Sequence, residues 1–248
     1  MTSIDLNCDL GEGGEHDRAL MRLITSTSIA CGAHAGDAAT MRAAVELAKR
    51  HGVAIGAHPG LNDRQHFGRR ELPVSPSEAH RLVLTQTRVL QVIAQQSGAK
   101  VAHVKPHGAL YHMAARDLSL ARAIASAVRE ADPQLILYGP PGSQLLAAGR
   151  ARGLRVASEV FADRTYQRDG SLTPRTEPGA MIADANAAIA QVRQMVHDGV
   201  VTAVDGETVP ITANTVCLHG DGAQAVFFAT RLKSELSKAR IEFKAPGA

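Results

Sequence analysis

The sequence contains no tryptophan, and aromatic residues make up only 3% of its 248 residues. A core with so few rings must rest on alanine, valine, leucine and isoleucine. Nucleic-acid binding by base stacking needs exposed aromatic platforms, which this composition hardly supplies. The formal net charge is only +3, and the basic residues are spread along the chain without forming a block. We therefore expect no nucleic-acid partner.

Cysteine is also scarce. Cys8, Cys31 and Cys217 are odd in number and widely spaced, so a disulfide framework is not expected. Each follows or ends an apolar run, which predicts a buried, reduced thiol. No basic leader opens the chain, and no apolar run reaches the roughly 18 residues that a membrane span requires. These absences predict a soluble, cytoplasmic protein that does not contact a membrane.

Several short catalytic signatures are missing as well. The chain has no G-x-x-x-x-G-K-[ST] loop for nucleotide phosphates, no H-E-x-x-H zinc motif and no paired C-x-x-C motifs. It also lacks the G-x-S-x-G turn that carries a nucleophilic serine. A metal or nucleotide site in this protein would therefore have to be assembled from residues that lie far apart in the sequence.

Apolar runs alternate with helix-like segments along the chain. The predicted strands are Ser3–Cys8, Ser26–Cys31, Val53–Ala57, Val101–Lys105, Gln134–Tyr138, Leu154–Val160 and Asn214–Leu218. The predicted helices cover residues 17–24, 38–51, 77–97, 117–131, 142–152, 180–198 and 222–236. Such alternation predicts parallel strands joined by right-handed crossovers. We expect an α/β fold with a single domain over residues 1–248, an irregular seven- or eight-stranded (β/α) TIM-like barrel. An open, doubly wound sheet is the alternative.

The ends of the predicted helices carry capping signals. Ser75 or Ser77 is a suitable N-cap for the helix 77–97, and Asp37 suits the N-cap of the helix 38–51. Four helices are followed by a glycine that can take the left-handed C-cap conformation, namely Gly52, Gly98, Gly153 and Gly199.

Two stretches interrupt the alternation. Residues 163–179 form a long polar loop, which predicts either a lid over a site or a solvated excursion. Residues 200–211 predict a hairpin that turns at Asp205-Gly206. This hairpin could be a flap over the strand ends or a plain surface feature.

Polar clusters follow six of the predicted strands. They contain an acid, a histidine or a lysine, and each precedes a helix-like segment. The carboxyl ends of parallel strands lie at one end of a barrel, where such folds hold their active sites. Because burying titratable groups is costly unless they are paired, this crowding indicates an enzyme.

The first cluster lies in DLNCDLGEG. Asp5, Asn7 and Asp9 alternate, so they share one face of their strand, either the barrel interior or the helix layer. Asp9 and Glu12 at the strand end could bind a metal or act as an acid and base pair. Glu12 could also simply favour a helix N-terminus, and Asn7 is expected to hydrogen-bond in or behind the site.

Two further clusters contain histidines without an evident structural role. His34 lies in ACGAHAGD, where Asp37 is better explained as a helix cap. His58 lies between Gly-Ala and Pro-Gly, which is an unusual setting for a core residue. The loop 61–70 that follows contains Arg64 and further arginines, which could recognise a carboxylate or phosphate.

The densest cluster is HVKPHGALYH. His103 and Lys105 share strand parity, and His107 follows a proline. A lysine at a strand end can orient an anion or polarise a carbonyl group. Lys105 and His107 are therefore candidates for the site, as are Glu159 in SEVFADR and His219 in CLHGDG.

Taken in order, DLNCDLGE, ACGAHAGD, GAHPG, HVKPHGALYH, E-V-FADR-Y and C-HGDG resemble the LamB/YcsF family over essentially the whole chain. The resemblance implies an irregular seven-stranded barrel related to carbohydrate deacetylases. It also implies ATP-dependent cleavage of 5-oxo-L-proline (pyroglutamate) to L-glutamate, as the A subunit of a 5-oxoprolinase that works with subunits B and C. Phosphorylation of the lactam oxygen would make the ring carbon electrophilic, so that an activated water could attack it.

Within that resemblance, the expected catalytic residues are Asp9, His58, Lys105 and His107. Asp9 or His58 would act as the base, and Lys105 would bind the anion. The expected substrate-binding residues are Asn7, Glu12, His34, Arg64, Glu159 and His219. ATP, bound with magnesium, is the expected cofactor, and the missing phosphate loop allows it to sit on a partner subunit.

Two alternatives remain open at the level of sequence. The chain could be a metal-dependent amidohydrolase or deacetylase acting alone, with a divalent metal on Asp9, His58 and His107. It could also be a non-catalytic subunit that binds ligand while its partners perform the chemistry.

Overall fold

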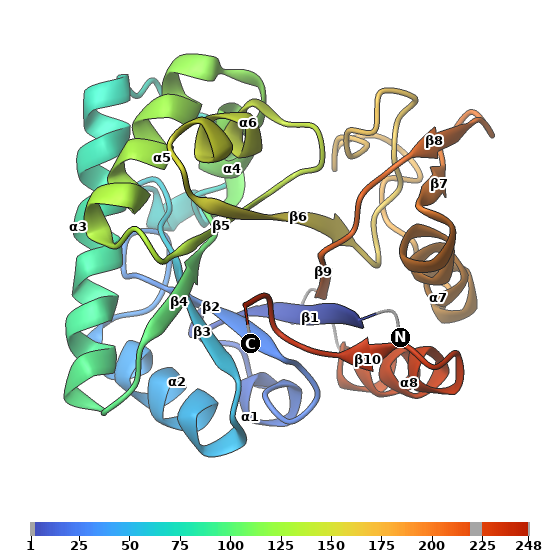
Figure 1. Cartoon of the computed structure of the whole chain (residues 1–248), viewed down its shortest axis with the longest axis horizontal. Helices are drawn as coiled ribbons and strands as arrows, with labels where there is room; N and C mark the ends of the chain where they lie inside the picture. The colour runs from blue at the N-terminus through green and yellow to red at the C-terminus, as the bar shows by residue number, and fades with distance from the viewer. Residues whose placement is uncertain (1–2, 219–224, 248) are drawn as a thin grey trace.

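The computed structural model describes residues 3–218 and 225–247, and a ring of parallel strands lies at its centre (Figure 1). Within these ranges seven strands pair in the order β1-β2-β3-β4-β5-β6-β9, and β9 pairs back with β1. Their bounds are Ser3–Leu10 (β1), Ser26–Ala30 (β2), Ala54–His58 (β3), Val101–Val104 (β4), Ile136–Gly139 (β5), Arg155–Phe161 (β6) and Thr215–Leu218 (β9). The predicted barrel is confirmed with seven strands, and the open sheet is wrong because the β1–β9 pairing closes the ring.

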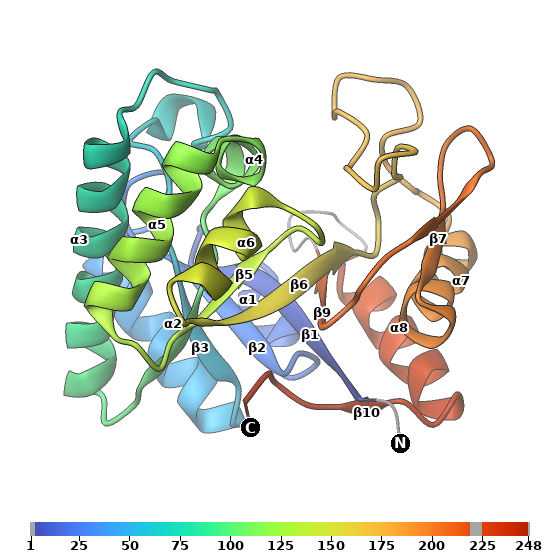
Figure 2. The same ribbon diagram turned by 45° about the horizontal axis from the view of Figure 1, so that its top comes forward.

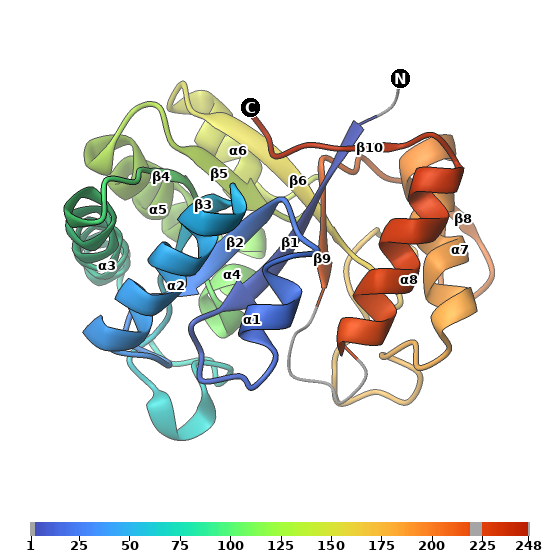
Figure 3. The same ribbon diagram turned by 90° about the horizontal axis from the view of Figure 1, so that it is seen from below.

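Helices surround the ring on its outside, as the view from below shows (Figure 3). Their bounds are Asp17–Leu20 (α1), Ala38–His51 (α2), Pro76–Gln96 (α3), Gly108–Arg116 (α4), Leu118–Ala131 (α5), Gln144–Ala151 (α6), Ala185–Arg193 (α7) and Ala225–Lys238 (α8). A 3₁₀ turn, η1 (Arg64–His66), and a π turn, η2 (Gln194–Asp198), add to them. A short strand, β10 (Glu242–Phe243), pairs in parallel with the start of β1.

The capping signals are borne out at the helix ends. Ser75, and not Ser77, is the N-cap of α3, where it forms a reciprocal capping box with Glu78. Asp37 caps α2 through the backbone N–H of Thr40, which confirms its structural role. The four predicted C-cap glycines all have left-handed φ values, between 67° and 71°.

The sequence located the barrel strands better than the helices. Each predicted strand ends within two residues of the observed bounds. By contrast, α1 is only one turn long, and α7 starts at Ala185 instead of residue 180 because Asp184 caps it there. The helix α4 was missed, since His107 at its N-cap makes no side-chain capping bond that a sequence pattern could signal.

The two faces of β1 separate the apolar core from a polar interior. Ile4, Leu6, Cys8 and Leu10 pack in the apolar cluster between the strands and the helices. Asp5, Asn7 and Asp9 point into the barrel, where Asn7 contacts side chains of β6 and β9. The alternation in DLNCD therefore faces the interior, which was one of the two predicted orientations.

The predicted hairpin is confirmed as β7 (Val200–Thr202) and β8 (Thr208–Pro210), which lie beside the loop 163–179 at the right of the barrel (Figure 2). The backbone N–H of Val204 donates to the Tyr166 carbonyl at 2.9 Å. Within the loop, the buried Arg164 donates to the carbonyls of Thr173 and Ala180. The first bond joins the loop to the hairpin and the Arg164 bonds hold the loop together, while a lid function for either segment stays a prediction.

All three cysteines are buried and free, as predicted. None of the helices in the described ranges combines the length and the apolar character needed to span a bilayer.

Candidate active site

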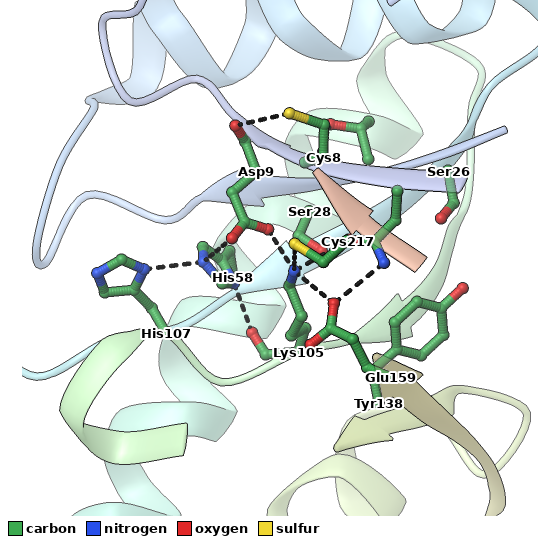
Figure 4. A network of polar contacts seen from close by, with 12 residues as sticks. Cys8, Asp9, Ser26, Ser28, His58, Lys105, His107, Tyr138, Glu159 and Cys217 are labelled. Atoms are coloured by element: carbon green, nitrogen blue, oxygen red, sulfur yellow. Dashed lines mark hydrogen bonds and ion pairs between the residues drawn. The ribbon is translucent and has the colours of Figure 1, made fainter. Parts of the chain in front are cut away.

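The carboxyl ends of β1, β3, β4 and β6 bring four of the predicted residues together inside the barrel (Figure 4). Asp9 is on β1, His58 ends β3, Lys105 follows β4, and Glu159 is on β6. Their side chains form one continuous network of hydrogen bonds and ion pairs. The convergence expected from a parallel barrel is therefore present for residues that are up to 150 positions apart (9 and 159).

Lys105 lies at the centre of this network and is only 2% exposed. Its Nζ lies 2.6 Å from Asp9 Oδ1 and 2.8 Å from Glu159 Oε1, and it donates to Asn7 Oδ1 at 3.0 Å. Burial alone would lower the pKa of Lys105, but the charges of Asp9 and Glu159 raise this pKa well above its ordinary range. The buried lysine is therefore an ammonium ion.

Asn7 fixes the carboxylate of Glu159 and is itself held by Thr215. Asn7 Nδ2 donates to Glu159 Oε1 at 3.0 Å and to Thr215 Oγ1 at 2.7 Å. Asn7 thus bridges the lysine and its carboxylate, which makes it a positioning residue in the barrel. The side chain of Glu159 is fully buried, and its carboxylate lies below the Lys105 ammonium in the view of Figure 4. The substrate-binding roles expected for both residues stay predictions.

Asp9 is the part of the ion-pair network that reaches solvent. Its side chain is 21% exposed, whereas those of Lys105 and His58 are each 2% exposed. Burial would raise the pKa of Asp9, but His58 and Lys105 outweigh it and hold this pKa well below its usual range. Asp9 is therefore a carboxylate that is ionised, held in place and accessible.

A cluster of three histidines lies beside Asp9. His58 Nε2 is 3.3 Å from Asp9 Oδ2 and 2.9 Å from His107 Nδ1. The ring of His34 stacks on that of His107, with 3.7 Å between the centroids and 3° between the planes. Gly60, from the sequence GAHPG, permits this packing, because a Cβ there would lie 2.6 Å from His34 Nδ1.

Glu12 joins the histidines from the other side. Its Oε1 atom is 3.1 Å from His34 Nε2, 3.5 Å from His107 Nδ1 and 3.9 Å from His58 Nε2. Burial and the charge of Asp9 raise the pKa of Glu12. Burial, together with His58, lowers the pKa of His34 to about 3 and that of His107 to about 2. The two rings are thus neutral near pH 7 and can offer lone pairs.

The donor atoms of this cluster fit a divalent metal. One atom each from Glu12, His34, His58 and His107 lie within 4.8 Å of one another. The set shares His58 and His107 with the metal ligands considered from the sequence, but it has Glu12 and His34 in place of Asp9. Imidazole nitrogens with a carboxylate oxygen are ligands typical of zinc and related ions.

The arrangement fits a nucleotide less well. Lys105 already contacts two carboxylates, so its charge is not available for a triphosphate. Arg64 donates to the backbone carbonyls of Gly32 and Gly36 at 2.9 and 2.8 Å, and thereby holds the loop that carries His34. The anion-binding roles expected for Lys105 and Arg64 stay predictions.

One predicted site residue is not described by the structure, and two residues of the site were not predicted. His219 lies outside the described residues. Cys217 is buried and reduced as predicted, but it was not expected in the site, where its Sγ atom lies 3.4 Å from Lys105 Nζ. Thr215 was missed altogether. Thr215 and Cys217 alternate along β9, and their pairing with Asp5 and Asn7 of β1 places both on the interior face, which the sequence alone does not reveal.

Comparison with known proteins agrees with the motifs. The sequence model of the LamB/YcsF family matches residues 4–248. This chain belongs to the LamB/YcsF family. A 5-oxoprolinase A subunit from Geobacillus kaustophilus (strain HTA426) is 54% identical over 252 residues, covering 99% of this chain and 98% of that protein.

Solved structures place this LamB/YcsF chain in a wider group of barrels. The crystal structure of a lactam utilization protein from Thermus thermophilus has a TM-score of 0.93 and 43% identity, and the match covers 98% of this chain and 99% of that one. A polysaccharide deacetylase from Bacillus cereus has a TM-score of 0.50 and 14% identity, covering 99% and 92% of the two chains. The second likeness concerns the fold alone, and it agrees with the expected relation to deacetylase barrels.

Proposed function

We propose that this chain is the A subunit of an ATP-dependent 5-oxoprolinase, which cleaves 5-oxo-L-proline to L-glutamate together with subunits B and C. The observation that carries the hydrolytic part is Asp9, a carboxylate kept ionised by Lys105 and His58 and yet 21% exposed. The choice of substrate and partners rests on the names of full-length relatives such as the one from Geobacillus kaustophilus.

In this proposal Asp9 is the general base. It accepts a proton from water, whose oxygen forms a bond to the carbon of the O-phosphorylated lactam, while the carbon–nitrogen bond breaks and the nitrogen takes up the proton. The product of this step is glutamyl γ-phosphate, and a second water hydrolyses it to glutamate and inorganic phosphate. Asp9 suits this role better than His58, because its carboxylate is accessible and the His58 ring is not. Lys105 holds the carboxylate in position and opposes the negative charge that develops beside it.

ATP supplies the driving force by activating the lactam oxygen, and we assign its binding chiefly to a partner subunit. The chain has no phosphate-binding loop, and Lys105 is already paired with Asp9 and Glu159. The reduced, buried cysteines suit a cytoplasmic location, which is part of the same proposal.

The test is release of glutamate from 5-oxo-L-proline, measured with and without ATP, by the chain alone and mixed with subunits B and C. We expect ATP-dependent release in the complete mixture only. No release in any mixture of folded, assembled subunits would reject the substrate.

A metal-dependent amidohydrolase or deacetylase is the second candidate, favoured by the cluster of Glu12 with three histidines. It predicts hydrolysis by the chain alone, without ATP and sensitive to chelators. A non-catalytic, ligand-binding subunit predicts instead that the complex remains active when Asp9 is neutralised.

A further inference from the structure

We infer that His58 Nε2, His107 Nδ1 and Glu12 Oε1 form a binding site for one divalent transition-metal ion of the zinc class. The three atoms lie 2.9 Å (His58–His107), 3.5 Å (His107–Glu12) and 3.9 Å (His58–Glu12) apart. The site stands on this geometry and does not depend on the proposed 5-oxoprolinase activity.

Backbone carbonyls determine which nitrogen of each ring carries its proton. His58 Nδ1 lies 2.7 Å from the Lys105 carbonyl oxygen, so it must be the N–H donor of that ring. His107 Nε2 lies 2.8 Å from the Phe67 carbonyl oxygen and is likewise a donor. A carbonyl oxygen has only lone pairs, and this second hydrogen bond commonly fixes the tautomer of a metal-binding histidine.

When both rings are neutral, the other two nitrogens present lone pairs to each other. The positive charge that His58 directs at Asp9 is then the proton shared by these two nitrogens, or the metal ion that takes its place. His58 Nε2 and His107 Nδ1 are only 2.9 Å apart, and their rings are nearly perpendicular at 85°. Two acceptors at this separation require a cation between or beside them, either a proton or a metal ion. The perpendicular rings allow both lone pairs to point at a common ion.

Two carboxylates favour the metal over the shared proton. Asp9 Oδ2 is 3.3 Å from His58 Nε2, and Glu12 Oε1 faces both rings. One proton could satisfy one acceptor at a time, whereas a single ion can contact several. Ligand atoms about 2.0–2.2 Å from one zinc ion are themselves roughly 3.0–3.5 Å apart, close to the separations seen here.

His34 supports this site without being one of its ligands. Its ring is parallel to that of His107, with 3° between the planes and 3.7 Å between the centroids, so the two in-plane lone pairs cannot meet at one ion. His34 Nε2 lies 3.1 Å from Glu12 Oε1 and is placed to orient that carboxylate. It is a positioning residue for Glu12.

The ligand chemistry selects the ion. Two imidazoles with one carboxylate suit Zn²⁺, Co²⁺, Fe²⁺ or Ni²⁺, whereas Mg²⁺ and Ca²⁺ prefer oxygen ligands. Three protein ligands are typical of metal sites that keep an open position. Glu12, whose side chain is 18% exposed, lies on the side of the cluster that solvent reaches.

The test is direct metal binding by the full chain. Protein stripped with a chelator is titrated with Co²⁺, followed by visible absorption, and then with competing Zn²⁺. We expect one equivalent per chain, with stoichiometric binding lost in His58→Ala and His107→Ala. His34→Ala should weaken binding by about 10- to 100-fold, as losses of supporting groups typically do. Excess Mg²⁺ should not displace the ion.

A matched control is His80→Ala, because His80 pairs with Glu130 away from the cluster and should leave binding unchanged. Thermal unfolding of each variant, with and without Zn²⁺, separates loss of the site from loss of the fold, since a bound ion raises the stability only of a protein with the site. Equal binding by wild type and by folded His58→Ala or His107→Ala protein would overturn the inference. Folded wild-type protein that binds no metal ion would also overturn the inference, and a proton shared by His58 and His107 would then explain their contact. Absence of 5-oxoprolinase activity would not overturn the metal site.

Discussion

Asp9 combines two properties that rarely occur together in one carboxylate. It contacts a buried ammonium at 2.6 Å and yet has 21% of its side chain exposed. His58 and Lys105 keep its pKa well below the usual range, so it is ionised near neutral pH. If activity falls at mildly acidic pH, we expect the cause to be a group other than Asp9.

Replacing Asp9 by Asn should remove the base and keep its shape. We expect turnover in the complete 5-oxoprolinase mixture to fall by about 10²- to 10⁴-fold, the usual contribution of a general base. Asp37→Asn is the matched control, since asparagine caps a helix as well as aspartate does and should retain activity. Turnover by Asp9→Asn near that of wild type would reject the assignment.

Lys105→Met tests the buried ion pair. The substitution leaves Asp9 and Glu159 beside each other without their cation, and loss of one partner of a buried pair commonly costs about 3–5 kcal/mol. Urea unfolding should show this loss. The double variant Lys105→Met/Glu159→Gln removes one unpaired carboxylate, so it should recover part of the stability. Strictly additive losses would indicate that the pair is not coupled.

At the scale of single elements, caps determine where the helices begin. Ser75 accepts from the backbone N–H of Glu78, and the Glu78 carboxylate accepts from the backbone N–H of Ser75. Ser75→Ala should lower the free energy of unfolding by about 1 kcal/mol, as loss of an N-cap commonly does. Ser77→Ala, two residues along and inside the helix, should change it by less than about 0.5 kcal/mol. Equal effects in urea unfolding would contradict the cap assignment.

The sequence predicted the strands and helix caps because these features are local. Alternation in DLNCD, glycines after helices and serine or aspartate before them act over a few residues. The helix α4 has no such signal at His107, and α7 begins five residues later than its pattern suggested. The start of α4 is held by distant backbone partners, Pro59 and Gly68, which no local pattern can indicate, whereas the Asp184 cap of α7 is a local signal that was overlooked.

The sequence could predict which residues form the site, but it could not predict how their side chains are arranged. Strand ends identified Asp9, His58, Lys105 and Glu159, which do meet in the barrel. Nothing in the sequence could indicate that the carbonyls of Phe67 and Lys105 fix the histidine tautomers, or that His34 stacks on His107. Those contacts depend on how loops from different strands pack together.

At the scale of the whole molecule, a buried histidine links stability to pH. His103 packs inside the barrel against Gly56 and stacks on Tyr138 with 4.1 Å between the ring centroids. Burial, followed by the charge of Lys105, lowers its pKa to about 3. Between that value and the unfolded pKa of roughly 6.5, the unfolded chain binds one more proton than the folded protein at this residue.

Stability should therefore fall as pH falls through this window. Within this window His103 alone lowers the free energy of unfolding by about 1.4 kcal/mol for each pH unit of acidification. Above pH ~6.5 this destabilisation is absent. Urea unfolding of metal-free wild type and His103→Gln, compared between about pH 4 and about pH 7, measures the difference. The variant should have the shallower slope, and parallel profiles would contradict a neutral, buried His103.

Closure of the barrel through β1 and β9 also bears on how the protein is made. Asn7 and Thr215, hydrogen-bonded across this seam, are 208 positions apart. A chain emerging from the ribosome presents β1 first, but the partner strand follows only after most of the protein has been synthesised. The ion pairs of the interior must then wait for the last barrel strand, and pairings of such long sequence separation form slowly. Fragments that end before β9 should accumulate as open sheets with an exposed β1 edge, and this makes them natural clients for chaperones.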